Sequence, residues 1–134
     1  MMPLREALDV RVNVALTTPT APSARLRQWL ADVLAALAED VLHDVLLVCS
    51  ELVANAYDHA RGPRRLRLHQ VDAGARLRVE VQDASPHHLP TQGRSTAGPD
   101  RGRGLVLVDT LTGHRWGVHV SPGAKTVWAE IPLS

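Results

Sequence analysis

Three polar residues in the middle of the chain stand at helical spacing. Glu51, Asn55 and Asp58 lie at i, i+4 and i+7, so a helix would align them as one polar stripe beside its apolar face. A carboxylate and a carboxamide at the edge of a core need partners, and a hydrated divalent cation with its bound phosphates would satisfy them. The alternative is the solvated flank of an ordinary amphipathic helix.

Asp83 is a second candidate, because it ends the apolar face of a predicted strand. A carboxylate at the inner end of a core strand can accept a hydrogen bond from an exocyclic amino group, and in this way it could recognise the edge of adenine. Alternatively, Asp83 caps the turn formed by Ala84, Ser85 and Pro86, which is a common role for aspartate.

Two further segments could contact an anionic ligand. Gly102-Arg103-Gly104 precedes an apolar helical segment, and the free N–H groups of a helix start favour a phosphate. A structural turn would explain the same glycines. Lys125 and Thr126 could add a cation and a hydroxyl near a ligand, although a hairpin could instead turn both toward solvent.

These residues must be positioned by a small number of elements. Alternating apolar residues predict strands at 8–16, 66–71, 76–83, 115–120 and 125–131, with hairpins at 72–75 and 121–123. Helical spacing predicts helices from 19 or 23 to 37, from 41 to 60 and from 105 to 111. The fold class is therefore α+β, a two-layer sandwich whose helices cover one face of a mostly antiparallel, mixed sheet.

The central predicted helix has one wide apolar face, which would pack on the sheet. Its members are Val41, Leu42, Val45, Leu46, Cys49, Leu52, Val53, Ala56, Tyr57 and Ala60. A polar link at 39–40 is expected before this helix. Residues 84–102 hold prolines, glycines and small polar residues without periodicity, which predicts a long mobile loop of the kind that is usually functional or disordered.

Composition limits the range of functions. A chain of 134 residues with 45% hydrophobic residues predicts one domain, over 8–133 with a tail at 1–7. A formal net charge of +1 gives no electrostatic reason for binding nucleic acid or an anionic membrane. Cys49 is the only cysteine, so no intramolecular disulfide forms, and a cytoplasmic location is expected. No apolar run is long enough to span a bilayer.

Taken together, these motifs resemble the GHKL ATP-binding superfamily in order and spacing. Within it, Ser-Glu-Leu-Val-x-Asn-Ala, Gly-Arg-Gly-Leu-x-Leu-Val and Lys-Thr-Val-Trp are similar to the anti-sigma factor/serine kinase branch of actinobacteria. The resemblance implies that the ligands are ATP and Mg²⁺, with Glu51 as general base, Asn55 as magnesium ligand and Asp83 as acceptor of the adenine amino group. It makes 84–102 the ATP lid. The other implied nucleotide contacts are Asp58, His59, Ser85, Arg101, Gly102, Arg103, Gly104, Leu105, Lys125 and Thr126.

The resemblance implies two functions of different classes. The first is a cytoplasmic protein serine/threonine kinase that phosphorylates an antagonist protein and alternately binds a sigma factor. The second is a partner-switching module that binds nucleotide without phosphoryl transfer, or binds none. Intact Glu51 and Asn55 favour the first, whereas Ala84-Ser85-Pro86, where the superfamily often has Gly-x-Gly, favours the second. Related proteins often dimerise, so the chain can also be expected to form a homodimer.

Overall fold

The protein has two layers, a β-sheet and a set of helices that cover one of its faces. A computed structural model describes residues 10–89 and 103–133, without the side chains of Arg103 and Gly104. Its five strands are β1 (Arg11–Leu16), β2 (Arg64–Val71), β3 (Arg76–Asp83), β4 (Trp116–Ser121) and β5 (Ala124–Pro132), in the sheet order β1-β2-β3-β5-β4. The helices are α2 (Ser23–Val33), α3 (Glu39–His59) and α4 (Arg103–Leu111), with the short 3-10 helix η1 at Asp72–Gly74.

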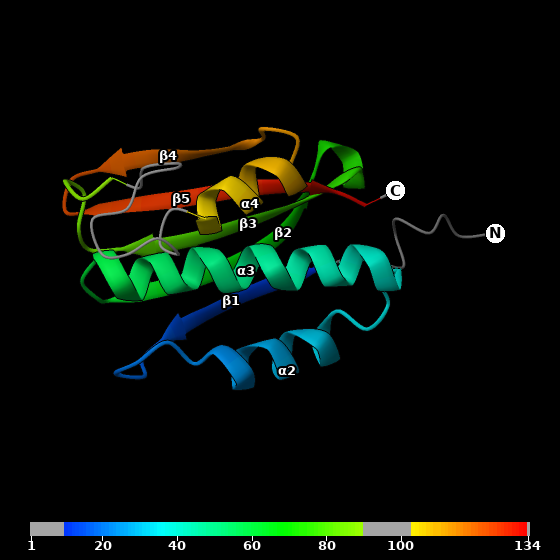
Figure 1. The fold of residues 1–134 in the computed structure, drawn as a ribbon, viewed down its shortest axis with the longest axis horizontal. Coiled ribbons are helices and arrows are strands. Elements are labelled where there is room, and N and C mark those ends of the chain that lie inside the picture. Colours follow the sequence, from blue (N-terminus) through cyan, green and yellow to red (C-terminus); the bar gives the residue numbers. More distant parts are fainter. Residues whose placement is uncertain (1–9, 90–102, 134) are drawn as a thin grey trace.

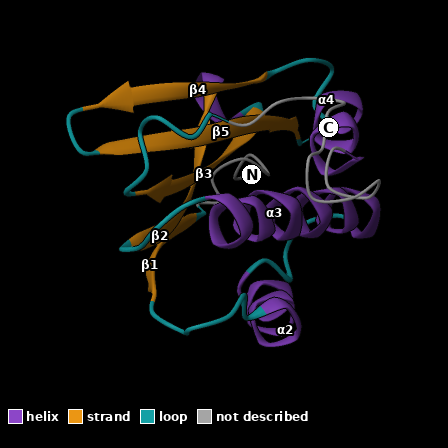
Figure 2. Ribbon diagram, turned by 60° about the vertical axis from the view of Figure 1, so that its left-hand side comes forward, coloured by secondary structure: helices purple, strands orange, loops and turns teal. Residues whose placement is uncertain are grey.

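All three helices lie on the same side of the sheet (Figure 1 and Figure 2). Each pair of neighbouring strands is antiparallel. The predicted α+β two-layer sandwich is therefore confirmed, and the mixed sheet expected from the sequence has no parallel pair among the described strands. None of the helices in the described ranges is long and apolar enough to cross a membrane.

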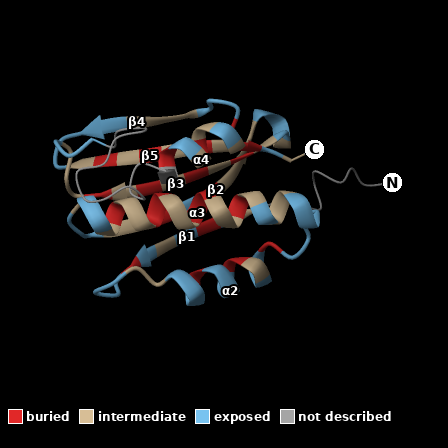
Figure 3. Ribbon diagram, viewed as in Figure 1, coloured by how far each residue is buried: buried red, intermediate tan, exposed pale blue. Residues whose placement is uncertain are grey.

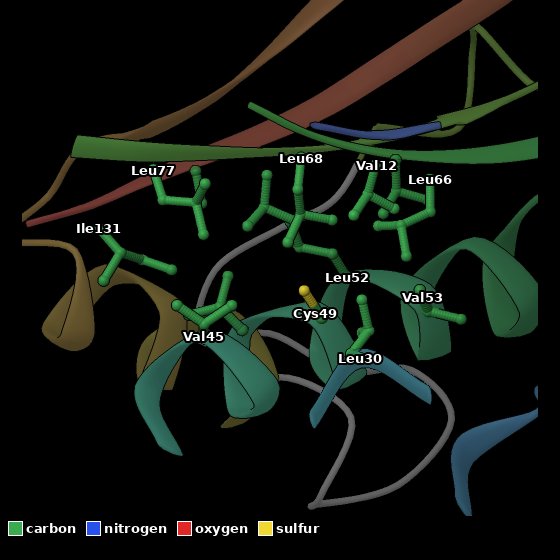
Figure 4. Packing of buried hydrophobic residues seen from close by; sticks show 14 of the residues in the cluster. Val12, Leu30, Val45, Cys49, Leu52, Val53, Leu66, Leu68, Leu77 and Ile131 are labelled. Atoms are coloured by element: carbon green, nitrogen blue, oxygen red, sulfur yellow. The ribbon is translucent and has the colours of Figure 1, made fainter. Parts of the chain in front are cut away.

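Helix α3 is the longest element of the described structure and spans one face of the sheet (Figure 3). Its apolar face packs against α4, β3, α2 and β5, in a core that also includes residues of β1 and β2, and several of the side chains in this core are labelled in Figure 4. The apolar face predicted for this helix omitted Val48, which is fully buried. The buried face is therefore wider than predicted. The buried members are Val45, Val48, Cys49, Leu52, Val53 and Ala56. Burial raises the pKa of the Cys49 thiol to about 12.

The ends of two helices differ from the prediction for physical reasons. Helix α3 begins at Glu39, so the expected polar link is its first turn, where acidic side chains interact favourably with the macrodipole. Helix α2 ends at Val33 instead of 37. The Leu37 amide still bonds the Leu34 carbonyl at 3.0 Å, and both leucines are buried. The chain thus keeps these leucines in the core after the helix has ended.

Arg64, the first residue of β2, holds the end of α3. Its Nε donates to the Ala56 carbonyl at 2.9 Å and its Nη2 donates to the Ala60 carbonyl at 2.7 Å. Its guanidinium also lies 4.0 Å from the centre of the Tyr57 ring. Carbonyl groups at a helix C-terminus lack intrahelical partners, so these contacts satisfy them and fix the position of the second half of α3.

Candidate functional site

The predicted site residues come from elements that meet at one end of the molecule. Figure 1 shows the C-terminal end of α3, the end of β3, the beginning of β5 and the beginning of α4 all directed toward the left. Asp83, the last residue of β3, stands opposite Lys125 of β5 in the sheet register. The antiparallel pairing of β3 and β5, with α3 packed against them, therefore brings the C-terminal end of α3, residues 83–85 and Lys125 to the same end of the molecule.

Glu51 and Asn55 are one helical turn apart on α3 and both are partly buried. Burial raises the pKa of the Glu51 carboxyl above its usual value of 4.5, because the charged form loses solvation. The Asn55 amide nitrogen Nδ2 is buried and has no hydrogen-bond partner among the described residues. An amide with an unpaired buried atom is unfavourable, so Asn55 differs from a residue on the solvated flank of a surface helix.

The unpaired Asn55 amide fits the ligands that the resemblance implies. A phosphate oxygen could accept from its nitrogen, and its carbonyl oxygen is a hard ligand that suits Mg²⁺. Magnesium is commonly held by one or two protein oxygens together with substrate phosphates. No group of three or more His, Cys, Asp or Glu in the described ranges is arranged to hold a metal ion, so a metal here would depend on Asn55 and on phosphate.

Asp83 is buried and already has several partners. Its Oδ1 accepts the Ser85 amide at 2.8 Å, which closes the turn that the sequence offered as an alternative. Lys125 Nζ lies 3.0 Å from Oδ1 and 3.0 Å from Oδ2 of the same carboxylate. The expectation that a hairpin could turn Lys125 toward solvent is wrong, because Lys125 is only 3% exposed.

Ser85 contacts this carboxylate through its backbone amide and anchors the turn through its carbonyl and its hydroxyl. Its carbonyl accepts Lys125 Nζ at 3.0 Å, and its Oγ accepts the Arg61 amide at 2.8 Å. The Ala84 amide donates to the Arg61 carbonyl, also at 2.8 Å. The turn after β3 is thereby tied both to β5 and to the segment that follows α3.

The remaining predicted nucleotide contacts do not all lie beside Asp83 and Lys125. Thr126 lies opposite Gln82 and His119 in the register, and strand alternation places it on the face away from Lys125 and the helices. Asp58 and His59 are exposed in the last turn of α3. Arg103 and Gly104 begin α4, and Leu105 is buried in the core. Arg101, Gly102 and most of the predicted lid, residues 90–102, lie outside the described residues.

The sequence reasoning missed the pairing of Lys125 with Asp83, although a signal was present. Lys125 shares its strand face with Val127, Ala129 and Ile131, all of which are buried. A cation on an apolar face requires an anionic partner, and Asp83 is the carboxylate placed at the end of the neighbouring apolar face. Strand alternation applied to both strands would have placed both charges on the buried face, where each of them requires a partner.

The raised pKa of Glu51 predicts a pH-dependent stability. A carboxyl that binds its proton more tightly in the folded state stabilises the protein at low pH, and this contribution is lost as the pH rises from 4.5 through the folded-state pKa. We expect the free energy of unfolding of wild type, relative to Glu51→Gln, to fall across that window. Urea unfolding between pH 4 and 7 measures it, and a difference that stays constant with pH would contradict the shift.

Comparisons with known proteins identify the fold and the family of this chain. The sequence model of the histidine kinase-like ATPase domain matches residues 17–131. Among solved structures, the RsbU and RsbW domains of Rv1364c from Mycobacterium tuberculosis share the fold, with a TM-score of 0.65 and 18% sequence identity. That match covers 92% of this chain and 32% of the other. No curated protein matches this chain. The family match includes nearly all of the described elements, and the chain belongs to the histidine kinase-like ATPase domain family, the GHKL type of ATP-binding fold.

Proposed function

We propose that this chain is a cytoplasmic, Mg-ATP-dependent protein serine/threonine kinase that acts as a partner-switching anti-sigma factor. The observation that carries the proposal is the buried, unpaired amide of Asn55 one turn from the half-buried Glu51. In a family defined by an ATPase domain, such an amide is suited to a bound nucleotide phosphate. The proposed partners are an antagonist protein that accepts the phosphoryl group and a sigma factor that is bound alternately.

Each of the two α3 residues has a distinct role in this proposal. Asn55 holds the phosphates and the magnesium ion, which neutralises negative charge on the transferring group when it is bound. Glu51 accepts the proton of the attacking serine or threonine hydroxyl. The hydroxyl oxygen forms a bond to the γ-phosphorus, the bond from that phosphorus to the β–γ bridging oxygen breaks, and ADP leaves. Desolvation makes the Glu51 carboxylate a stronger base, which suits this role.

The adenine ring and the phosphates would be bound by other residues at the same end of the molecule. We assign the amino group of adenine to Asp83, which lies at the end of β3 beside Lys125. The start of α4 at Arg103 offers free backbone N–H groups, and these favour a phosphate. Purine selectivity follows from Asp83, because guanine carries a carbonyl oxygen where adenine carries the amino group.

A second candidate function is supported by a specific observation. The Asp83 carboxylate is already bonded to Lys125 and to the Ser85 amide, so it is partly satisfied without nucleotide. This arrangement favours a partner-switching module that binds nucleotide without transfer, or binds no nucleotide. Direct binding measurements distinguish this module from the kinase.

Asn55→Ala tests the site and separates binding from folding. We expect the affinity for Mg-ATP to fall by about 10-fold or more, since a hydrogen bond to a charged group is lost. Stability without nucleotide should stay the same or increase, because an unpaired buried amide is removed and alanine is the better helix former. Isothermal titration calorimetry and urea unfolding measure the two quantities.

Asn13→Ala provides the matched control. Asn13 lies on β1 on the open side of the sheet, where its Oδ1 accepts from Arg65 at 2.7 Å, so its removal should leave ATP affinity unchanged. If Asn55→Ala binds ATP as tightly as wild type does, the proposed phosphate site is wrong.

GTP should bind at least about 10-fold more weakly than ATP, because guanine offers Asp83 no amino group at that position of the purine ring.

A further inference from the structure

Lys125 is the only lysine in the chain, and it is one of the most buried charged groups of the described structure. All the other residues among the fifteen lysines and arginines of the chain are arginines. Lys125 is 3% exposed and its partner Asp83 is 2% exposed. Taking two charges out of water is costly unless their geometry is good and the remaining donors and acceptors are satisfied.

The contacts of this pair show that the carboxylate is occupied. The Lys125 ammonium lies 3.0 Å from each carboxylate oxygen and donates to the Ser85 carbonyl at 3.0 Å. The Ser85 amide supplies a further donor to Oδ1 at 2.8 Å. Asp83 Oδ1 therefore accepts two hydrogen bonds, and the ammonium group forms its ion pair at 3.0 Å from both carboxylate oxygens.

The position of the ammonium group is also fixed by its surroundings. The Ser85 carbonyl that holds it belongs to a turn bonded to Arg61 through the Ser85 hydroxyl and the Ala84 amide. The lysine stem extends from β5, whose next inward residue, Val127, is buried in the core. The ammonium group is thus held over the carboxylate from both β5 and the turn after β3.

We propose that Lys125 is an internal competitor for the nucleobase, occupying the Asp83 carboxylate until an adenine amino group takes its place. This inference rests on the proposed function, because it takes Asp83 as the residue that recognises adenine. A neutral amino group that replaces a charged donor gains only the difference between the two interactions. Lys125 therefore lowers the affinity for the base and makes the empty site stable without nucleotide.

The inference predicts an unusual direction for a charge-removing substitution. Lys125→Met removes a positive charge, which by itself should weaken the binding of anionic ATP. If Lys125 competes with the base, the variant should instead bind Mg-ATP about 10-fold more tightly or better, because the base no longer displaces a charge-assisted hydrogen bond. Titration calorimetry on the variant and on wild type measures the change.

Arg115→Met is the matched control for charge. Arg115 forms an ion pair of 3.7 Å with Glu130, a residue that does not contact Asp83 in any described interaction, so this variant should bind ATP no more tightly than wild type. If Lys125→Met is folded and binds ATP equally or more weakly than wild type, the competitor role is overturned. If Lys125→Met binds ATP more tightly than wild type and Arg115→Met does not, the competitor role is supported.

The same inference can be tested on the wild-type protein, should Lys125→Met fail to fold. A single lysine gives a single Nζ resonance after labelling with ¹⁵N-lysine. Saturating Mg-ATP should shift or broaden this resonance, and ribose 5′-triphosphate, which has no base, should leave it in place. A resonance that bound ATP does not move would overturn the inference alone. Absence of ATP binding in both folded proteins would overturn the proposed function, on which the inference rests.

Discussion

Glu51→Ala should lower the rate of phosphoryl transfer by about 10²-fold or more and leave the affinity for Mg-ATP within a few-fold of wild type. A positioned general base typically contributes a factor of about 10² to 10⁴. Glu51 is one turn from Asn55 on α3 and its carboxyl is partly desolvated, so the substitution removes the proton acceptor and keeps the amide that binds phosphate. The two α3 residues should therefore separate catalysis from binding.

Single-turnover transfer from labelled ATP to the co-purified protein partner measures the effect, and calorimetry measures the affinity. Asn55→Ala should lose both transfer and binding. Asp44→Ala is the matched control, since Asp44 is another partly buried carboxylate of α3 but lies in the first half of the helix. Transfer by Glu51→Ala at the wild-type rate would exclude this base, and no transfer by wild type that binds ATP would favour the passive module.

Much of the fold could be predicted because its elements have simple periodicity. Strand β3 was predicted with the bounds that the structure gives, since polar and apolar residues alternate from Arg76 to Gln82 and the alternation of burial continues to Asp83. Helix α2 was predicted too long, because a turn after Val33 keeps Leu34 and Leu37 in the core at nearly helical spacing. Periodicity records which side chains face inward, and a tight turn can preserve that pattern after the helix has ended.

The candidate site was only partly predictable, because some of its residues are close in the sequence and others are brought together only by the pairing of distant strands. Glu51 and Asn55 are four residues apart, so helical spacing alone predicts their common face. The pairing of Asp83 with Lys125 spans 42 positions, and it depends on the register of β3 and β5, which no local pattern specifies. Thr126 shows the same limit, because one step along a strand reverses the face that a side chain occupies.

The largest stability effect should come from breaking the Asp83–Lys125 ion pair. Lys125→Met leaves a carboxylate that is only 2% exposed without its cation, and removing one partner of a buried ion pair typically costs about 3 to 5 kcal/mol. Replacing both residues, as Asp83→Asn with Lys125→Met, leaves no buried charge. The double variant should therefore lose much less than the sum of the single losses, with a coupling of about 1 to 3 kcal/mol.

Urea unfolding of wild type, both single variants and the double variant completes this cycle. Arg76→Met is the matched control, because it breaks the ion pair between Arg76 and Asp72, whose side chains are 28% and 50% exposed, and such pairs contribute about 1 kcal/mol or less. Domains of this size have roughly 5 to 15 kcal/mol of stability, so Lys125→Met should still fold and remain usable in binding experiments. Additive losses in the double variant would show that Lys125 and Asp83 do not stabilise each other. In that case the lysine could not compete for the carboxylate either, because competition requires the same attraction that the cycle measures.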